Sequence, residues 1–295
     1  MQLSRRLAGV IGQPIAHSLS PALHRAAYAR LGADVDYVAH DVAPAELDTF
    51  IAALRREPWI GLSVTMPHKA AVAELVDHLN GDAVALGVVN TVLVEEGLLT
   101  GTNTDVQGIV ASLRHAGLER VQGRVKILGA GGTALAAMLA AHRLGAQDFE
   151  LLVRDPSRDG SLAALATSLG AQLTTRVLEP GTLRDVSGGE ATPLVMSTLP
   201  PHAADWLVAG ADPLPTQETQ EGIGGSGQVL LDVAYSPWPS ALATAWTASG
   251  GQVVSGLEML LYQAVEQVAL FTGIDLGGRD DVINVMCDSV GLPRR

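Results

Sequence analysis

The sequence predicts an α/β protein of two domains. Two separate runs, in which strand-like and helix-like segments alternate, support this prediction, because such alternation produces mostly parallel sheets covered by helices. The chain of 295 residues is long enough for two domains of ordinary size. Hydrophobic residues make up 47% of it, so both domains can bury a substantial core.

The first run of elements occupies the N-terminal part of the chain. Its strand-like segments are apolar or alternate with a period of two, and its helix-like segments repeat apolar residues at helical spacing. In chain order these are a strand at 7–11, a helix at 22–31, a strand at 35–41, a helix at 44–54 and a strand at 60–65.

The second run begins near residue 124. A compact apolar strand at 125–128 leads through a glycine-rich turn into an alanine-rich helix at 133–144. Further strands are predicted at 149–153, 173–177, 194–197 and 229–233. The stretch 210–228 is rich in Pro, Gly, Gln and Thr, which predicts a surface loop. A long amphipathic helix is predicted at 256–272.

Composition excludes several classes of partner. The formal net charge is −12 and the isoelectric point is near 5.0, so the surface repels nucleic acid and anionic lipid. No segment approaches the ~20 apolar residues that span a bilayer. A single cysteine, Cys287, excludes an internal disulfide and is compatible with a reducing compartment. We expect a cytoplasmic protein with no nucleic-acid or membrane partner, and either a monomer or a homodimer.

The turn after the strand at 125–128 has the pattern of a dinucleotide site. Gly129 permits the tight turn, Gly131 allows the backbone to approach a pyrophosphate, and Ala134 lets the helix pack close to the sheet. The N-terminus of the helix offers N–H donors to the anion. The alternative is a glycine-rich turn with no ligand. The whole turn reads Gly129, Ala130, Gly131, Gly132, Thr133 and Ala134.

The residues after the next strand bear on which dinucleotide is bound. NAD sites usually present an acidic residue to the ribose, whereas NADP sites place arginine near the 2′-phosphate. Arg154 stands at the end of the strand and Arg158 follows four residues later, so both guanidinium groups could hold one phosphate. This favours NADP. Asp155 leaves NAD open, because it could accept a ribose hydroxyl or merely cap the turn.

Polar residues gather at the ends of segments in the first run. Ser18 and Ser20 are two residues apart in an extended stretch and face the same way. Ser20 is expected to cap the following helix, and Ser18 is free to bind a carboxylate. Lys69 and Asp105 are the natural candidates for a catalytic pair of an ammonium and a carboxylate. Taken singly, a surface lysine and an N-capping aspartate are the simpler interpretations. Asn90 is either a buried turn residue or a ligand contact.

Period-two alternation also places Ser63 and Thr65 on one face of their strand. Three histidines occur near these segments, but their spacing provides no ligand set and no cysteine or paired carboxylate completes one, so we expect no metal. These histidines are His17, His24 and His68.

Taken in order, the motifs resemble those of shikimate dehydrogenases over essentially the whole chain. The matching segments are 12–21 (GQPIAHSLSP), 63–69 (SVTMPHK), 89–91 (VNT), 101–108 (GTNTDVQG), the glycine turn, and 256–264 (GLEMLLYQA). The resemblance implies a substrate domain of residues 1–104 plus 256–295, and a Rossmann-type NADP domain of residues 105–255. The active site would lie in the cleft between them.

The resemblance also implies roles for individual residues. Ser18 and Ser20 would hold the substrate carboxylate. A second group would form hydrogen bonds with the ring hydroxyls of the substrate: Thr65, Lys69, Asn90, Asp105 and Gln263. Tyr235 matches a tyrosine at the cleft, and Gly256 and Met259 would lie beside the nicotinamide.

The implied reaction is the reversible reduction of 3-dehydroshikimate to shikimate by NADPH, in the biosynthesis of chorismate and the aromatic amino acids. Lys69 would donate the proton or stabilise charge on the substrate oxygen. Two other functions stay open from the sequence: an NAD-dependent quinate/shikimate dehydrogenase, and a non-catalytic homologue that senses metabolites.

Three positions depart from the family pattern. Ser63 stands where asparagine is common. One substrate hydrogen bond is therefore expected to come from a shorter side chain or to be mediated by water. Arg25 stands where asparagine is frequent, and Asp155 stands where a hydroxyl residue is common.

Overall fold

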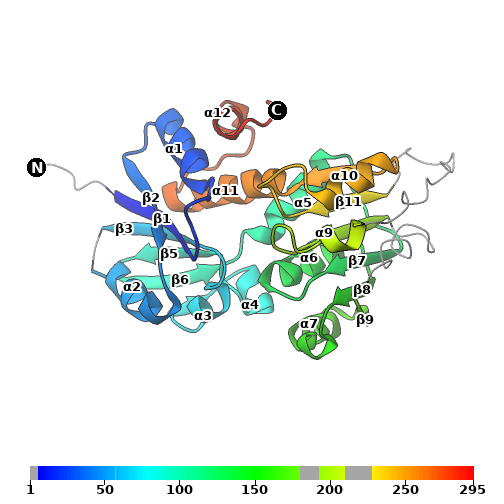
Figure 1. The fold of residues 1–295 in the computed structure, drawn as a ribbon. Helices are drawn as coiled ribbons and strands as arrows, with labels where there is room; N and C mark the ends of the chain where they lie inside the picture. The colour runs from blue at the N-terminus through cyan, green and yellow to red at the C-terminus, as the bar shows by residue number, and fades with distance from the viewer. Residues whose placement is uncertain (1–5, 57, 180–192, 210–227) are drawn as a thin grey trace, which may run out of the picture. The chain divides into compact units, whose positions relative to one another are not determined.

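The computed structural model describes residues 6–56, 58–179, 193–209 and 228–295 (Figure 1). The chain divides into two compact units. Unit 1 consists of Met1–Gly108 and Leu260–Arg295, and unit 2 is Ile109–Met259. The surface loop predicted at 210–228 lies, except for its last residue, outside the described residues.

Unit 1 is built on a six-stranded sheet. Its first three strands pair in parallel, whereas the fourth along the sheet, β5, runs antiparallel to both of its neighbours. The reversal between β5 and β6 comes from a two-residue turn, in which Glu96 and Gly97 both adopt the positive φ that a tight hairpin requires. The order across the sheet is β2 (Val35–Asp41), β1 (Arg6–Gly12), β3 (Trp59–Val64), β5 (Thr91–Glu95), β6 (Leu98–Thr102) and β4 (His78–Leu79).

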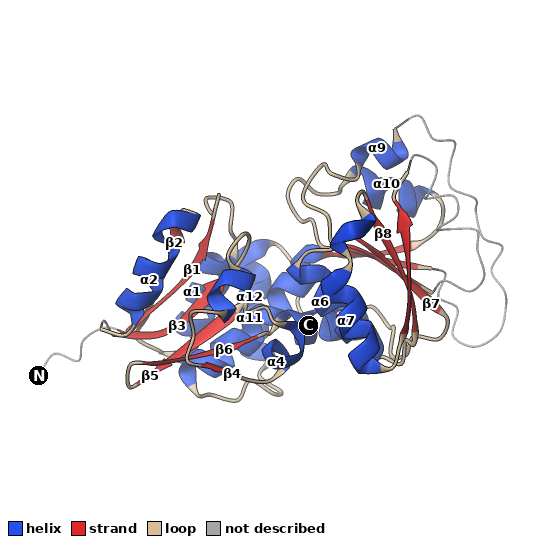
Figure 2. Cartoon of the chain, turned by 90° about the horizontal axis from the view of Figure 1, so that it is seen from below, coloured by secondary structure: helices blue, strands red, loops and turns tan. Residues whose placement is uncertain are grey.

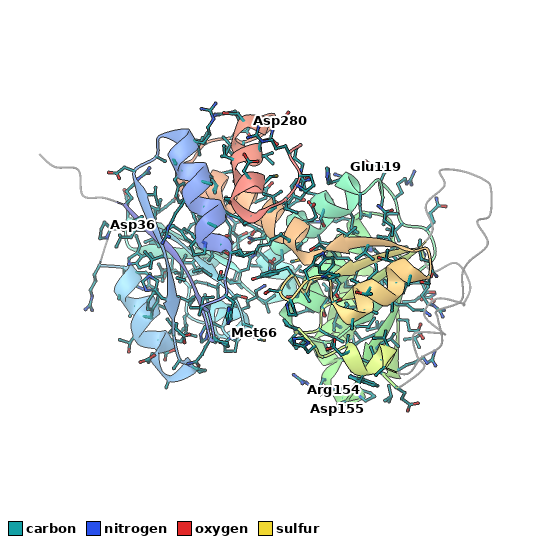
Figure 3. All side chains as sticks on the ribbon, turned by 45° about the horizontal axis from the view of Figure 1, so that its top comes forward. Asp36, Met66, Glu119, Arg154, Asp155 and Asp280 are labelled. Atoms are coloured by element: carbon teal, nitrogen blue, oxygen red, sulfur yellow. The ribbon has the colours of Figure 1, made fainter. Side chains whose placement is uncertain are left out.

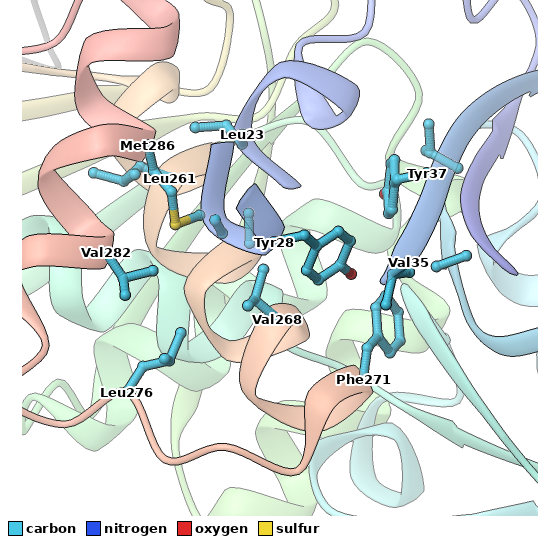
Figure 4. Close-up of a cluster of buried hydrophobic side chains, with 14 of the residues drawn as sticks. Leu23, Tyr28, Val35, Tyr37, Leu261, Val268, Phe271, Leu276, Val282 and Met286 are labelled. Carbon is cyan, nitrogen blue, oxygen red and sulfur yellow. The ribbon is translucent and has the colours of Figure 1, made fainter. Parts of the chain in front are cut away.

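Both faces of this sheet carry a hydrophobic core, because side chains alternate along each strand. In β1, Ala8 and Val10 face one core, and Leu7 and Ile11 face the other. Figure 4 shows the first core packed around one long helix. Its helices are α1 (Ser20–Leu31), α11 (Gly256–Thr272) and α12 (Asp280–Val290). The second core is covered by α2 (Leu47–Leu54), α3 (Lys69–Ala73) and α4 (Asp82–Leu86).

Unit 2 holds a second six-stranded sheet, and every strand pair recorded in it is parallel (Figure 2). The order across the sheet is β12 (Gln252–Ser255), β11 (Val229–Asp232), β10 (Leu194–Ser197), β7 (Arg124–Leu128), β8 (Asp148–Val153) and β9 (Gln172–Val177). The first strand of the unit, β7, is therefore central. The chain reverses its direction of travel between β7 and β10, which is where sheets of this kind bind ligands at the carboxyl ends of their strands.

The helices of unit 2 connect these parallel strands. They are α6 (Gly132–Arg143), α7 (Gly160–Leu169), α9 (Asp205–Val208) and α10 (Ala241–Ala248). Each division between the units falls inside a helix, namely α5 (Asp105–His115) and α11. None of the helices in the described part of the chain has the length and apolarity needed to cross a membrane.

One local prediction is wrong. Helix α1 begins at Ser20, so the capping position belongs to Leu19 and Ser20 is not the N-cap. Instead, the hydroxyl oxygen of Ser18 accepts a hydrogen bond from the Ser20 backbone N–H at 3.3 Å. Ser18 thus makes a local hydrogen bond just before α1, but no side chain takes the N-cap role expected of Ser20.

Candidate active site

Two loops of unit 1 meet at the carboxyl edge of its sheet. They follow β1 and β3, which are parallel neighbours. Gln13 N donates a hydrogen bond to Met66 O at 3.1 Å. Gly12 has no room for a side chain, because a Cβ there would lie 2.5 Å from Thr65 Cγ2. The loop that carries the two predicted substrate-binding serines is therefore fixed against the loop that leads to Lys69.

Lys69 and Asp105 form an ion pair. Lys69 Nζ donates to Asp105 Oδ2, and the two side chains are 16% and 6% exposed. Each residue is the first of its helix, Lys69 of α3 and Asp105 of α5. The N-terminus of α5 favours the carboxylate through the helix dipole. The Lys69 carbonyl accepts a hydrogen bond from Val89 N at 2.9 Å, which fixes the start of α3 beside the segment containing Asn90.

Asn90 holds the second oxygen of the same carboxylate. Its Nδ2 donates to Asp105 Oδ1 at 2.7 Å. Its own Oδ1 accepts from Thr104 N at 2.8 Å and from Thr91 Oγ1 at 2.7 Å. Asn90 is 2% exposed. The asparagine is thus buried, and its amide binds the carboxylate of the ion pair.

Gln263 reaches this cluster from α11, more than 150 positions along the chain. Its Oε1 lies 3.5 Å from Asn90 Nδ2 and 3.5 Å from Thr104 Oγ1, and its Nε2 donates to Leu260 O at 2.9 Å. The structure therefore brings together four of the predicted site residues, Lys69, Asn90, Asp105 and Gln263. Ser20 is buried, and Ser18 and Thr65 are half-buried in the neighbouring loops.

Ser63 does not offer the substrate hydrogen bond expected of it. It is buried, its hydroxyl donates to Gln267 Oε1 at 2.7 Å, and it accepts from the Tyr37 hydroxyl at 2.7 Å. The single proton of the hydroxyl is thus already used inside the protein. Burial raises the pKa of Tyr37, partly offset by hydrogen bonds with Ser63 and Ser20, so the phenol stays protonated.

Sequence reasoning missed the buried polar residues behind the ion pair. His24 stacks on Tyr37 with ring centroids 3.9 Å apart, and Gln267 contacts both His24 and Ser63. Arg25, to which no role was given, donates from Nε to Tyr37 O at 2.9 Å. A signal for Gln267 existed, because it lies one helical turn after Gln263 on the apolar face of α11. His68 contacts Val42 O through Nε2 at 2.8 Å, which gives it a structural role.

The glycine turn of unit 2 is tightly constrained at Gly129 and open at Gly131. Gly129 adopts φ +101°, and a Cβ there would lie 2.8 Å from Thr198 Oγ1, so only glycine is accommodated. Gly131, at the N-cap of α6, has no atom within 4 Å of its would-be Cβ. Ala134 is completely buried. Open space before the first N–H groups of a twelve-residue helix fits the phosphates of a dinucleotide.

The arginines after β8 are accessible to a ligand. Arg154 and Arg158 are exposed, and Figure 3 shows Arg154 and Asp155 projecting from the surface of unit 2. Asp155 Oδ1 accepts hydrogen bonds from Ser157 N at 3.0 Å and Ser157 Oγ at 2.7 Å. These bonds, together with the charge of Arg158, lower the pKa of Asp155. The carboxylate thus caps the short 3₁₀ turn Pro156–Arg158 and remains charged.

Three further predicted residues belong to unit 2. Tyr235 follows β11 and is half-buried, and burial raises its pKa. The loop bearing it is held by Asp232, whose Oδ1 accepts from Ala234 N at 3.2 Å. Gly256 has a structural reason to be glycine, because a Cβ would lie 2.1 Å from Val233 O. Met259, also on α11, is buried with 7% exposure.

Two family models match the chain. The model of the shikimate dehydrogenase substrate binding domain matches residues 10–92, and the model of the shikimate 5′-dehydrogenase C-terminal domain matches residues 256–276. A curated relative from Rubrobacter xylanophilus, named shikimate dehydrogenase (NADP(+)), is 40% identical over 272 residues, which cover 91% of each chain.

Solved structures match over nearly the same length. Shikimate dehydrogenase of Mycobacterium tuberculosis has a TM-score of 0.80 and 33% identity, and the match covers 97% of this chain and 99% of that one. Shikimate 5-dehydrogenase of Thermus thermophilus, determined in complex with NADP(H) and shikimate, has a TM-score of 0.75 and 28% identity, with coverage of 97% and 100%.

Proposed function

Because the chain belongs to the shikimate dehydrogenase family, we propose that it catalyses the reversible, NADPH-dependent reduction of 3-dehydroshikimate to shikimate. The family, the two-domain α/β fold and the NADP-dependent oxidoreductase class predicted from the sequence are confirmed by the comparisons. The observation in the chain itself that carries this function is the ion pair of Lys69 with Asp105, whose carboxylate is also held by Asn90.

We propose that this cluster performs the proton chemistry of the reaction. NADPH, when bound, supplies the hydride. As the ketone carbon of the substrate is reduced, its oxygen gains negative charge, and Lys69 stabilises that charge and gives the oxygen a proton. Asp105 fixes the ammonium through one oxygen, while Asn90 fixes the other oxygen. The pair is nearly buried, which strengthens its electrostatic effect on the reacting oxygen.

Substrate binding is proposed to use the remaining polar residues of the site. Ser18 and Ser20 would hold the carboxylate, since both stand at the start of α1. Thr65, Asn90 and Gln263 would form hydrogen bonds with the ring hydroxyls, and Tyr235 would be a further contact.

Cofactor binding is proposed to use the carboxyl edge of the sheet of unit 2. The backbone of 129–134 would hold the pyrophosphate, and Arg154 and Arg158 would hold the 2′-phosphate. The support is the open space at Gly131 and the exposure of both guanidinium groups. Gly256 and Met259 would lie beside the nicotinamide.

We further propose that residues 1–104 and 256–295 bind substrate and that residues 105–255 bind the cofactor. Hydrogen exchange of the full chain, with shikimate and with NADP added separately, tests this division. Shikimate should protect amides in the first set, and NADP should protect amides in the second. Protection by each ligand spread evenly over both sets would contradict the division.

The cellular setting is likewise a proposal. The net charge of −12 and the single cysteine support a cytoplasmic enzyme that works as a monomer or homodimer without nucleic acid. Light scattering of the purified protein, with and without added DNA, would test both its oligomeric state and its indifference to nucleic acid.

The experiment that tests the function is an absorbance assay of the reduced nicotinamide with four combinations of cofactor and substrate. NADP or NAD is combined with shikimate or quinate. We expect the highest kcat/KM with NADP and shikimate. Faster turnover of quinate with NAD would support the quinate/shikimate alternative. Tight binding of shikimate without turnover in any combination would support the non-catalytic alternative.

A further inference from the structure

We propose that Gln267 is a positioning residue of the active site, which acts through Thr91 and Asn90 on Asp105. The inference rests on the proposed function, because it takes Asp105 to hold the lysine that serves the reacting oxygen. Gln267 is 1% exposed and lies on α11, one turn beyond Gln263. Both polar atoms of its side-chain amide are hydrogen-bonded inside unit 1.

The orientation of the Gln267 amide is fixed by a backbone group. One end of the side-chain amide lies 3.2 Å from the backbone oxygen of Asn90 and 2.8 Å from Thr91 Oγ1. A carbonyl oxygen only accepts hydrogen bonds, so this end must be Nε2. The other end, Oε1, therefore faces Ser63 Oγ at 2.7 Å and His24 Nε2 at 3.2 Å, and both of these groups must donate to it.

The hydrogen bonds of His24 and Ser63, on the Oε1 side of Gln267, agree with this orientation of the amide. Complete burial lowers the pKa of His24 to about 3, so the ring is neutral and carries one proton. That proton must be on Nε2, which leaves Nδ1 to accept from the Tyr28 hydroxyl at 3.0 Å. Ser63, which donates to Gln267, in turn accepts from the Tyr37 hydroxyl. Every donor in this buried group meets an acceptor.

The same direction continues from Gln267 to the ion pair. Thr91 Oγ1 accepts a hydrogen bond from Gln267 Nε2 and donates one to Asn90 Oδ1 at 2.7 Å. The Thr104 N–H, which only donates, contacts the same atom of Asn90 at 2.8 Å and so independently identifies that atom as the amide oxygen Oδ1. Asn90 Nδ2 therefore faces Asp105 Oδ1. The bonds run one way, from buried tyrosines to the carboxylate, and such chains polarise each successive donor.

Loss of the Gln267 amide would release this arrangement at two points. The Thr91 hydroxyl could turn toward Thr104 Oγ1, which is 3.4 Å away. The backbone carbonyl of Asn90 would also lose the hydrogen bond that it accepts from Gln267 Nε2. Asp105 would then hold Lys69 less firmly. Because a small misplacement of a catalytic group slows the chemical step more than it weakens binding, kcat should fall about 10- to 100-fold with KM little changed.

The test compares four substitutions in the full-length protein. Gln267→Met keeps the size of the side chain and removes its amide, and Thr91→Val keeps the shape and removes the hydroxyl. Both should lower kcat by at least about 10-fold, and their effects should not add when combined, because they interrupt one chain. Thr91→Ser restores a hydroxyl and should recover most of the kcat. Val268→Ala, next to Gln267 in the apolar core, should lower the melting temperature and leave kcat unchanged.

A fifth variant tests the direction of the chain. In Gln267→Glu, an ionised carboxylate offers no donor to Thr91 or to the Asn90 carbonyl, whereas a protonated one donates from one oxygen. The ratio of its kcat to that of the wild type should therefore rise as the pH falls. Behind Gln267 the titratable side chains are His24, Tyr28 and Tyr37, and their pKa values are shifted so that each stays neutral through the assay range. The charged pair at the other end of the chain, Asp105 and Lys69, is the same in both proteins that the ratio compares.

An activity-independent measurement separates this inference from the proposed function. The side-chain NH₂ signal of Asn90 in an NMR spectrum should be protected from exchange in the wild type and in Val268→Ala, and should lose protection in Gln267→Met or Thr91→Val. A wild type with no turnover but with this pattern would overturn the function and leave the orienting role supported. Turnover of both variants within about twofold of Val268→Ala, or unchanged Asn90 exchange, would overturn the inference. If Gln267→Met does not fold, Thr91→Val decides.

Discussion

Asn90 donates from its side-chain amide to Asp105 at 2.7 Å, on the carboxylate oxygen that Lys69 leaves unoccupied. One carboxylate is therefore held by two donors from separate segments of the chain. If Lys69 is catalytic as proposed, an ammonium positioned in this way would need little rearrangement during the reaction, which is the condition under which electrostatic stabilisation of a transition state is most effective.

Removal of the ammonium should affect turnover more than binding. In Lys69→Ala we expect kcat to fall by about 10²- to 10⁴-fold with little change in the KM of shikimate, because the interaction is formed with charge that develops in the transition state. Steady-state kinetics measure both values, and circular dichroism should show an unchanged fold. A variant with near-normal turnover would show that Lys69 has no catalytic role.

Two glycines of the glycine turn, which is proposed to bind the cofactor, should respond differently to alanine. Gly131→Ala meets no atom within 4 Å, so the protein should keep its melting temperature while the KM of NADP rises, since the methyl group occupies the space proposed for phosphate. Gly129→Ala should lower the melting temperature, because it combines φ +101° with a contact of 2.8 Å to Thr198. Thermal melts and cofactor titrations distinguish the two. Equal losses of stability would contradict the description of an open turn.

Asp155 should reduce the preference for NADP. Its carboxylate stays charged beside Arg154, where it would repel a 2′-phosphate. Asp155→Ser retains an oxygen that can cap Ser157 N, and should lower the KM of NADP without a comparable change for NAD. Because Asp155 and Arg154 are both exposed, the change in the KM of NADP caused by Asp155→Ser should shrink at high ionic strength. An unchanged ratio of the two KM values at low salt would argue that Asp155 is remote from the phosphate.

His24 should make the protein less stable in mild acid. The folded protein keeps this ring neutral down to about pH 3, whereas an unfolded histidine binds a proton below its model value of 6.5. The contribution of His24 to the free energy of unfolding is therefore fully present above pH 6.5. It is lost progressively as the pH falls from 6.5 toward 3. The loss from this residue amounts to about 2 kcal/mol at pH 5.

Urea unfolding between pH 7.5 and 4.5 measures this loss. His24→Asn should flatten the pH dependence, and the matched variant His17→Asn, at an exposed position, should not. A wild-type free energy of unfolding that stays constant over this range would contradict the assigned burial.

Local sequence patterns predicted most of the fold. Strands such as Val35–Asp41 and helix α11 occur with the predicted ends. The antiparallel hairpin was missed, although Glu96-Gly97 between β-branched and leucine residues is a turn signal. Strand β12 was also missed, because four residues, Gln252–Ser255, carry too little periodicity to identify.

The pair Lys69 and Asp105 could be predicted because charged residues at the ends of apolar segments are conspicuous. The roles of Ser63 and Gln267 could not. Each is an ordinary polar residue in sequence, and only tertiary packing shows that they bond to each other and not to a substrate. Which polar groups are paired depends on contacts between residues 204 positions apart, and no local pattern encodes such contacts.

The two-segment make-up of unit 1 has a consequence for biosynthesis. One of its cores combines Ala8 and Val10, which are made before unit 2, with Leu261 and Met286, which are made after it. Unit 2 is continuous and can complete its sheet during translation. We therefore expect the N-terminal part of unit 1 to keep an uncovered apolar surface, including Tyr28 and Tyr37, until residues 260–295 have been made. Chaperone demand and sensitivity to C-terminal truncation should both follow from that delay.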